Sequence, residues 1–300
     1  MPKIIECIPN FSEGRDQSVI DALAAAAKSV PGVSLLDYSA DASHHRSVFT
    51  LVGDELGIGE AAFRLAMLAA EKIDLTKHEG EHPRMGAVDV MPFVPVKGAT
   101  MAECVAVAKR VGARISQEIG IPVFLYEEAA TAENRRNLAT IRKGQFEGMA
   151  EKMRKPEWSP DYGEPQPHPT AGVVAVGARM PLVAFNVNLS TSDLSIADRI
   201  AKIVRGSSGG FKYCKGIGVM LADRNIAQVS MNMVNYEGTP LYRVVELIRA
   251  EAKRYGVTVI GTEIIGLAPA KALIDCAEYY LQIEHFDYGK QVLENHILGE

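Results

Sequence analysis

Two histidines, two carboxylates and an arginine lie together in one polar stretch, His78-Glu79-Gly80-Glu81-His82-Pro83-Arg84. Pro83 excludes a helix interior and pushes His82 towards an extended conformation, so we predict a loop that enters an apolar strand at residues 88–96. An imidazole with an unperturbed pKa of about 6.5 accepts and returns a proton near neutral pH. The stretch therefore predicts general acid–base chemistry at His82, and its alternative reading is a solvated surface loop.

Composition limits the classes of protein to which this chain can belong. Its 300 residues exceed the usual size of one hydrophobic core, so two compact lobes are expected. A net charge of −5 argues against general nucleic-acid binding. No run approaches the roughly 18 apolar residues that span a bilayer, and the N-terminus lacks a signal-peptide pattern. The four cysteines show no CxxC pairing, so we expect a cytoplasmic protein without disulfides or a metal site.

The first lobe is predicted as strand, helix, two strands, helix and strand, with one further helix and strand. Prolines at positions 92 and 95 place the strand 88–96 at a sheet edge or a bulge. Thr100 with Glu103 forms a capping-box pattern. The strands are expected at residues 4–9, 33–38, 47–53, 88–96 and 123–126, and the helices at 18–29, 58–73 and 100–119.

A basic, proline-rich stretch at residues 131–171 is predicted to connect the lobes, with at most two short helices. Regular alternation resumes at Gly172, and the helix at 240–255 has Thr239 as its expected N-cap. The chain is therefore predicted as α/β (α+β), with domains 1–180 and 181–300. Each domain is of the ferredoxin-like βαββαβ type, with a ligand groove between them. The later strands are expected at 173–177, 182–189, 216–221, 226–234 and 257–261, and the helices at 195–205, 240–255 and 269–282.

Five motifs along essentially the whole chain resemble the formiminotransferase domain family. They are Glu6-Cys7-Ile8-Pro9-Asn10-Phe11-Ser12-Glu13-Gly14, the stretch from His78 to Gly86, Thr100-Met101-Ala102-Glu103-Cys104, Ala184-Phe185-Asn186-Val187-Asn188-Leu189 and Ala227-Gln228-Val229-Ser230-Met231-Asn232.

The resemblance implies transfer of a formimino group from N-formimino-L-glutamate to tetrahydrofolate, the co-substrate, in histidine breakdown. It also implies that His82 is the catalytic residue, a general base that then acts as an acid. The implied folate-binding segment is Gly163-Glu164-Pro165-Gln166-Pro167-His168-Pro169-Thr170-Ala171-Gly172.

Both implied substrates are carboxylates, so the pocket should hold an arginine, and Arg46 and Arg84 are the candidates. Asn10 and Asn188 lie in or beside apolar strands, where a buried amide needs a partner, and are candidate substrate-binding residues. His78 is either a partner of the site or exposed. His44 and His45 are expected on an exposed loop.

Three other functions stay open from the sequence. A glutamate N-formyltransferase that uses 5-formyltetrahydrofolate would require the same donor–acceptor geometry. A non-catalytic folate-binding protein would need no neutral-pH base, and an RNA-binding module is disfavoured by the acidic charge. The predicted partners are small molecules and a second copy of the chain in a homodimer, with neither nucleic acid nor membrane.

Overall fold

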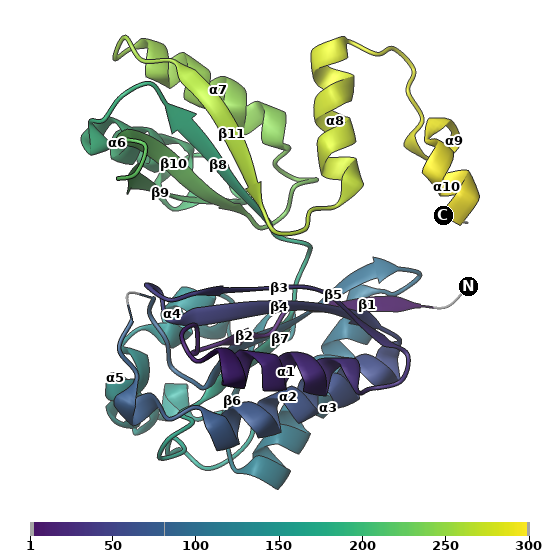
Figure 1. Cartoon of the computed structure of the whole chain (residues 1–300), viewed down its shortest axis with the longest axis vertical. Helices are drawn as coiled ribbons and strands as arrows, with labels where there is room; N and C mark the ends of the chain where they lie inside the picture. The colour runs from purple at the N-terminus through teal and green to yellow at the C-terminus, as the bar shows by residue number, and fades with distance from the viewer. Residues whose placement is uncertain (1–2, 81, 299–300) are drawn as a thin grey trace. The chain divides into compact units, whose positions relative to one another are not determined.

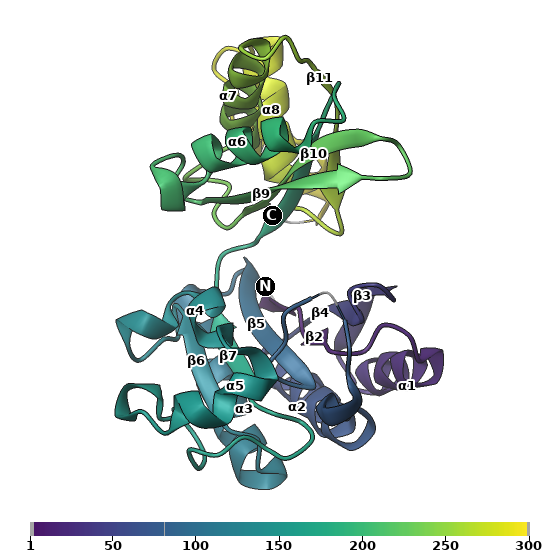
Figure 2. The ribbon, with the colours of Figure 1, turned by 90° about the vertical axis from the view of Figure 1, so that its left-hand side faces the viewer.

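The computed structural model describes residues 3–80 and 82–298, so Glu81 of the polar stretch lies outside the described residues. The chain divides into two compact units, residues 1–179 and 180–300, and each is considered by itself (Figures 1 and 2). Within the described residues, none of the helices combines the length and apolar character that crossing a membrane requires.

Unit 1 is built on a seven-stranded sheet in which β4 and β5 flank β1 and β2. Strand β3 pairs with the outer side of β4, and β7 and β6 extend the sheet beyond β5. All pairings are antiparallel except those of β7 with β5 and β6. The strands are β1 (Ile4–Cys7), β2 (Asn10–Phe11), β3 (Val33–Asp41), β4 (Arg46–Gly53), β5 (Val88–Lys97), β6 (Val123–Glu127) and β7 (Val174–Ala178).

Three helices, α1, α2 and α3, cover one face of this sheet (Figure 1). Phe11, Phe49 and Phe93 are fully buried beneath them. The predicted capping box at Thr100 is confirmed, because Thr100 and Glu103 bond each other's backbone amides. The helices of unit 1 are α1 (Gln17–Lys28), α2 (Glu55–Lys72), α3 (Met101–Ile119), α4 (Leu138–Arg142) and α5 (Gln145–Met153), with short 3-10 turns η1 (Leu75–Lys77), η2 (Glu133–Arg135) and η3 (Pro156–Trp158).

Strand β5 is central, so the prediction that its prolines mark a sheet edge is wrong. It pairs with β1 and β2 on one side and with β7 on the other. The alternative, a bulge, is confirmed near Pro95, where the register against β1 shifts between Ile4 and Ile5. Pro92 still accepts a hydrogen bond from the amide of Ile8 at 3.2 Å, since proline lacks only the donor.

The proline-rich stretch at residues 131–171 belongs to unit 1, so its prediction as the connection between units is wrong. Helices α4 and α5 fold back on the sheet extension, where Ile141, Met149 and Met153 are buried against Phe124. The stretch therefore forms a third layer of unit 1 with its own small apolar core.

Unit 2 has the predicted βαββαβ order, with an antiparallel sheet in the order β11-β8-β10-β9. Helix α7 begins after Pro240, whose side chain forms no capping bond, so the expected N-cap at Thr239 is wrong. Two short C-terminal helices, α9 and α10, were not predicted. The elements are β8 (Val183–Leu189), α6 (Leu194–Val204), η4 (Gly206–Ser208), β9 (Cys214–Leu221), β10 (Ile226–Met233), α7 (Leu241–Lys253), β11 (Val259–Ile265), α8 (Ala270–Leu281), α9 (Tyr288–Gln291) and α10 (Leu293–Leu298).

A candidate active site around His82

His82 lines a pocket of about 340 Å³ on unit 1. Side chains alternate between the two faces of a strand, so Phe49 of β4 lies in the core while Arg46 and Val48 lie on the opposite face. That opposite face forms one wall of the pocket. The lining residues are Ser39, Ala40, Asp41, His44, Arg46, Val48 and His82.

The guanidinium of Arg46 joins two predicted site residues, His82 and Asn10. Its Nη1 lies 3.1 Å from Nδ1 of His82 and donates to Oδ2 of Asp89 at 2.9 Å. Its Nε and Nη2 donate to Oδ1 of Asn10 at 3.2 and 2.8 Å. Asn10 is held in turn by a bond from its Nδ2 to the carbonyl of Ile8 at 2.8 Å. The orientation of Arg46 is thus fixed on three sides.

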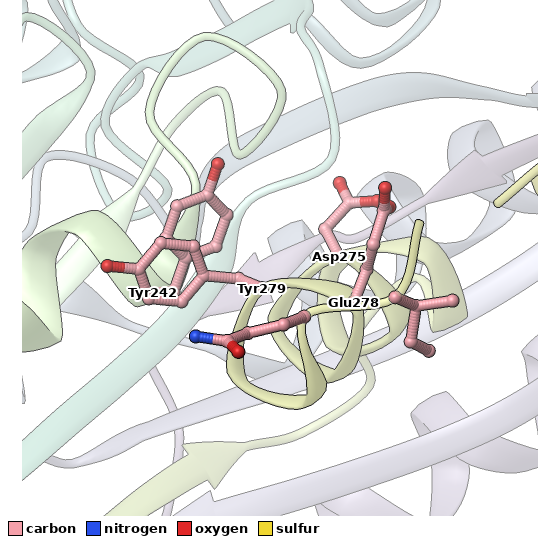
Figure 3. A pocket seen from close by; sticks show the side chains of 6 residues that line it. Tyr242, Asp275, Glu278 and Tyr279 are labelled. Carbon is pink, nitrogen blue, oxygen red and sulfur yellow. The ribbon is translucent and has the colours of Figure 1, made fainter. Parts of the chain in front are cut away.

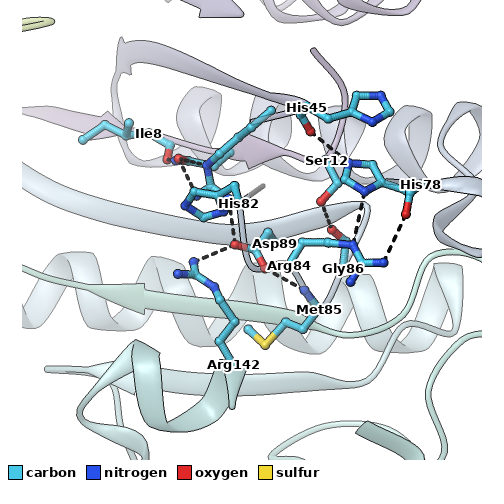
Figure 4. A network of polar contacts seen from close by, with 12 residues as sticks. Ile8, Ser12, His45, His78, His82, Arg84, Met85, Gly86, Asp89 and Arg142 are labelled. Carbon is cyan, nitrogen blue, oxygen red and sulfur yellow. Dashed lines mark hydrogen bonds and ion pairs between the residues drawn. The ribbon is translucent and has the colours of Figure 1, made fainter. Parts of the chain in front are cut away.

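Asp89 is a fully buried carboxylate shared by two arginines. Its Oδ2 accepts from Arg46 and, at 2.6 Å, from Nη2 of Arg142 on α4, while its Oδ1 accepts from the amide of Met85 at 2.9 Å (Figure 4). The two arginines hold the pKa of Asp89 below its ordinary value against the effect of burial. One carboxylate facing two guanidiniums gives this buried cluster a formal charge of +1, while Asp41 contributes a carboxylate to the lining of the same pocket.

His82 is neutral at physiological pH in this setting. Burial lowers the pKa of His82 to about 4, and the charges of Arg46 and Arg142 act in the same direction. Both effects disfavour the imidazolium, because a buried cation loses hydration and is repelled by like charge. A neutral imidazole retains a lone pair with which it accepts a proton.

The loop that carries His82 is anchored through His78 and Arg84. Nε of Arg84 donates to Nδ1 of His78 at 3.1 Å (Figure 4). Its two terminal nitrogens bond the two carboxylate oxygens of Glu147 at 2.9 and 2.6 Å. His78 was predicted to be either a partner of the site or exposed to solvent, and its exposed fraction of only 6% excludes the second alternative. The two terminal nitrogens of Arg84 are therefore already bonded to the carboxylate of Glu147, and this contact anchors the loop.

His45 supports the same loop, whereas His44 faces the pocket. The rings of His45 and His78 stack with centroids 4.1 Å apart. Nε2 of His45 lies 3.0 Å from a carboxylate oxygen of Glu13, and its Nδ1 lies 3.0 Å from the carbonyl of Glu79. The expectation of an exposed loop thus holds for His44 and is wrong for His45, whose side chain is 13% exposed.

The predicted folate-binding segment, residues 163–172, lies beside the His82 loop. Gly172 forms a β-bridge with Gly86, and the amide of Ala87 donates to the carbonyl of Ala171 at 2.9 Å. Gly172 has φ +67°, and a Cβ there would lie 2.2 Å from the carbonyl oxygen of Met85, so glycine is required. The structure therefore brings together two segments that the sequence separates widely.

Asn188 lies in unit 2, in a polar network formed by residues of that unit. Its Nδ2 donates to Glu263 at 2.8 Å, and its Oδ1 accepts from Nε2 of Gln228 at 2.8 Å. The side chain is 2% exposed and its amide is satisfied within the sheet. Its role in substrate binding stays a prediction.

Sequence reasoning missed Asp89 and Arg142. Asp89 carried a usable signal, because a carboxylate within an otherwise apolar strand is buried only when it is paired. Arg142 carried none, since its place depends on how α4 packs on the sheet.

A second pocket of about 340 Å³ lies on unit 2 between α7 and α8 (Figure 3). Its lining includes the stacked rings of Tyr242 and Tyr279 and the carboxylates of Asp275 and Glu278. This lining has no cation to pair with an anionic substrate, unlike the pocket at His82. In the described parts of the chain, no three histidine, cysteine or acidic side chains are placed to hold one metal ion.

Comparisons with known proteins place the chain in a family. Residues 4–179 match the formiminotransferase domain, N-terminal subdomain, and residues 184–295 match the formiminotransferase domain. The glutamate formimidoyltransferase of Streptococcus pyogenes serotype M1 is 69% identical over 100% of both chains. That of Thermoplasma acidophilum is 46% identical over 95% of each chain. The formimidoyltransferase-cyclodeaminase of Gallus gallus is 46% identical over 95% of this chain and 53% of its own length. The chain therefore belongs to the formiminotransferase domain family.

Proposed function

We propose that this protein transfers the formimino group of N-formimino-L-glutamate to tetrahydrofolate in histidine breakdown. The products are L-glutamate and 5-formiminotetrahydrofolate. The family match along both units and the 69% identity to a glutamate formimidoyltransferase support the substrates. The observation that carries the chemistry is a neutral histidine, His82, in a pocket whose wall carries Arg46 of the buried Arg46–Asp89–Arg142 cluster.

The reaction requires one proton to leave and one to arrive. The lone pair of N5 of tetrahydrofolate attacks the formimino carbon, and the C=N π electrons move to the imino nitrogen as the N5–C bond forms. The C=N bond then re-forms while the bond from carbon to the glutamate nitrogen breaks, with its electron pair going to that nitrogen. N5 loses a proton and the departing nitrogen gains one. His82 performs both transfers, a role worth about 10²–10⁴-fold in rate.

The charges around Asp89 give the substrate its orientation. Arg46 lines the pocket, and its cluster with Arg142 and Asp89 has one positive charge in excess, so a substrate carboxylate is attracted to Arg46 and repelled by Asp41 of the same lining. Arg84 is assigned a different task, because its fork is held by Glu147. It keeps the His82 loop in place and does not clamp the substrate.

Residues 163–172 are proposed to contact the folate. The bridge between Gly86 and Gly172 supports this, since it places the segment against the loop that carries His82. The segment also contributes backbone groups and the ring of His168, whose Nδ1 accepts from the amide of Ala171 at 3.0 Å.

A paired assay tests the proposal. The purified protein is given tetrahydrofolate with formiminoglutamate, and separately with formylglutamate, and both folate products are quantified. Faster formimino transfer is the expected result. Exclusive formyl transfer would identify a glutamate N-formyltransferase, and folate binding without turnover of either donor would identify a non-catalytic binding protein.

A further inference from the structure

The contact between Arg46 and His82 determines where the imidazole proton lies. Nη1 of Arg46 is 3.1 Å from Nδ1 of His82. A guanidinium carries only donors and stays charged in proteins, so the imidazole atom that faces it must accept. A neutral imidazole has one accepting nitrogen and one N–H, so the proton of His82 lies on Nε2.

We propose that Arg46 is a positioning residue that fixes His82 of the resting enzyme as the neutral tautomer protonated on Nε2. In this tautomer Nε2 of His82 is a hydrogen-bond donor, and its lone pair on Nδ1 faces Arg46. A proton that His82 takes up during turnover arrives on Nδ1, and this last point rests on the proposed function. The contact with Arg46 must lengthen in that step, because two N–H groups would otherwise face each other.

The surroundings hold Arg46 firmly enough for this role. Asn10 on β2 accepts from Nε and Nη2, and Asp89 on β5 accepts from the same Nη1 that faces His82. The guanidinium therefore has little freedom to turn away from His82. Asp89 stays anionic, since a second arginine, Arg142 on α4, donates to it.

The charged and titratable groups around His82 mostly favour a neutral ring. Arg46 and Arg142 repel an imidazolium, whereas Asp89 attracts it from beyond Arg46. His44, on the turn between β3 and β4, has its ring centroid 6.4 Å from that of His82 and an ion-pair distance of 3.1 Å to Asp41. No carboxylate in the described residues is hydrogen-bonded to the His82 ring, whose partners are the guanidinium of Arg46 and the backbone of Pro83.

His78 provides an internal comparison. Its Nδ1 accepts from Nε of Arg84 at 3.1 Å, and its Nε2 faces the carbonyl of His45 at 2.9 Å. His78 therefore has the same tautomer as His82, set by a different arginine. Changing Arg84 should alter the tautomer of His78, whereas the tautomer of His82 depends on Arg46.

Nitrogen NMR of the free protein labelled with ¹⁵N-histidine tests the assignment without any substrate. His82→Asn identifies the signals of His82 among the seven histidines. At pH 7 we expect Nδ1 of His82 to have the shift of an unprotonated nitrogen and Nε2 that of an N–H. Arg46→Met should give averaged shifts of mixed tautomers, and Arg46→Lys, which keeps a cationic donor, should restore the single tautomer.

Two controls separate the contact from charge alone. Arg142→Met removes a nearby charge without touching His82, so it should raise the pKa of His82 and leave the Nε2–H tautomer unchanged. Arg84→Met should change the tautomer of His78; although it loosens the loop that carries His82, Arg46 stays in place and should keep the proton of His82 on Nε2. A proton on Nδ1 of His82 in the unmodified protein, or no change of its shifts in a folded Arg46→Met, would overturn the proposal. Because the readout needs no turnover, failure of the formimino-transfer assay would leave it intact.

Kinetics provide the second readout. Arg46→Met should move the acid limb of the kcat/KM pH profile towards the ordinary histidine range, because burial still lowers the pKa of His82 while the lowering by the charge of Arg46 is lost. Arg46→Lys should keep the limb near its original position. A fall in rate with an unmoved limb in Arg46→Met would reduce Arg46 to a structural residue.

Discussion

Nη2 of Arg142 donates to Oδ2 of Asp89 at 2.6 Å, and this bond ties helix α4 to strand β5. The bond is made in the dry interior, since Asp89 has no exposed surface. Removing one partner of a buried ion pair leaves an uncompensated charge and destabilises the fold. The same contact therefore stabilises unit 1 and holds the charged groups beside His82 in place.

Asp89→Asn should destabilise the protein by about 3–5 kcal/mol in the free energy of unfolding, because two arginines would lose their buried counter-charge. Urea denaturation at neutral pH measures the change. Glu118→Gln is the matched control, since it breaks an exposed ion pair with Arg114 and should cost less than about 1 kcal/mol. Equal losses in the two variants would show that the Asp89 cluster contributes no more than a surface pair.

Arg84→Lys should lower stability by about 1–2 kcal/mol, because lysine cannot reproduce the fork that bonds Glu147. We also expect Arg84→Lys and Glu147→Gln each to lower kcat/KM, since either change releases the His82 loop. Steady-state kinetics and thermal melts of both variants measure this. A loss of kcat/KM in Arg84→Lys alone, with Glu147→Gln unaffected, would mean that Arg84 contacts the substrate directly.

The depressed pKa of His82, about 4, makes stability depend on pH. The unfolded ring takes a proton below about pH 6.5, whereas the folded ring stays neutral until about pH 4. Stability from this residue is therefore complete above pH 6.5 and is lost as the pH falls from 6.5 to 4. Urea titrations across this window should show a smaller loss in His82→Asn than in the parent protein. Parallel curves would contradict the low pKa.

Folate binding should protect residues 163–172 from hydrogen exchange, since that segment lies against the His82 loop through the Gly86–Gly172 bridge. Exchange measured with and without a folate provides the test, with α8 of unit 2 as an internal reference. Protection elsewhere in unit 1, with residues 163–172 unchanged, would move the folate site away from this segment.

The sequence predicted the order of the elements better than the place of single side chains. Periodicity identified both βαββαβ units, because alternating apolar residues are a local signal. The prolines of β5 suggested an edge, whereas a bulge and a bond accepted by Pro92 allow a central strand. His45 was expected to be exposed and Arg142 was not considered, because their contacts depend on segments distant in sequence: Glu13 for His45 and β5 for Arg142. Long-range packing is not encoded in local pattern.

The most direct test of the account is the kinetics of His82→Ala in formimino transfer from formiminoglutamate to tetrahydrofolate. His296→Ala, on α10 of unit 2, is the matched control for loss of an exposed histidine. The account predicts that His82→Ala lowers kcat by about 10²–10⁴-fold while folate affinity and the thermal melt stay close to those of the parent protein. A folded His82→Ala that keeps more than about a tenth of the parent rate would contradict the claim that His82 transfers the proton.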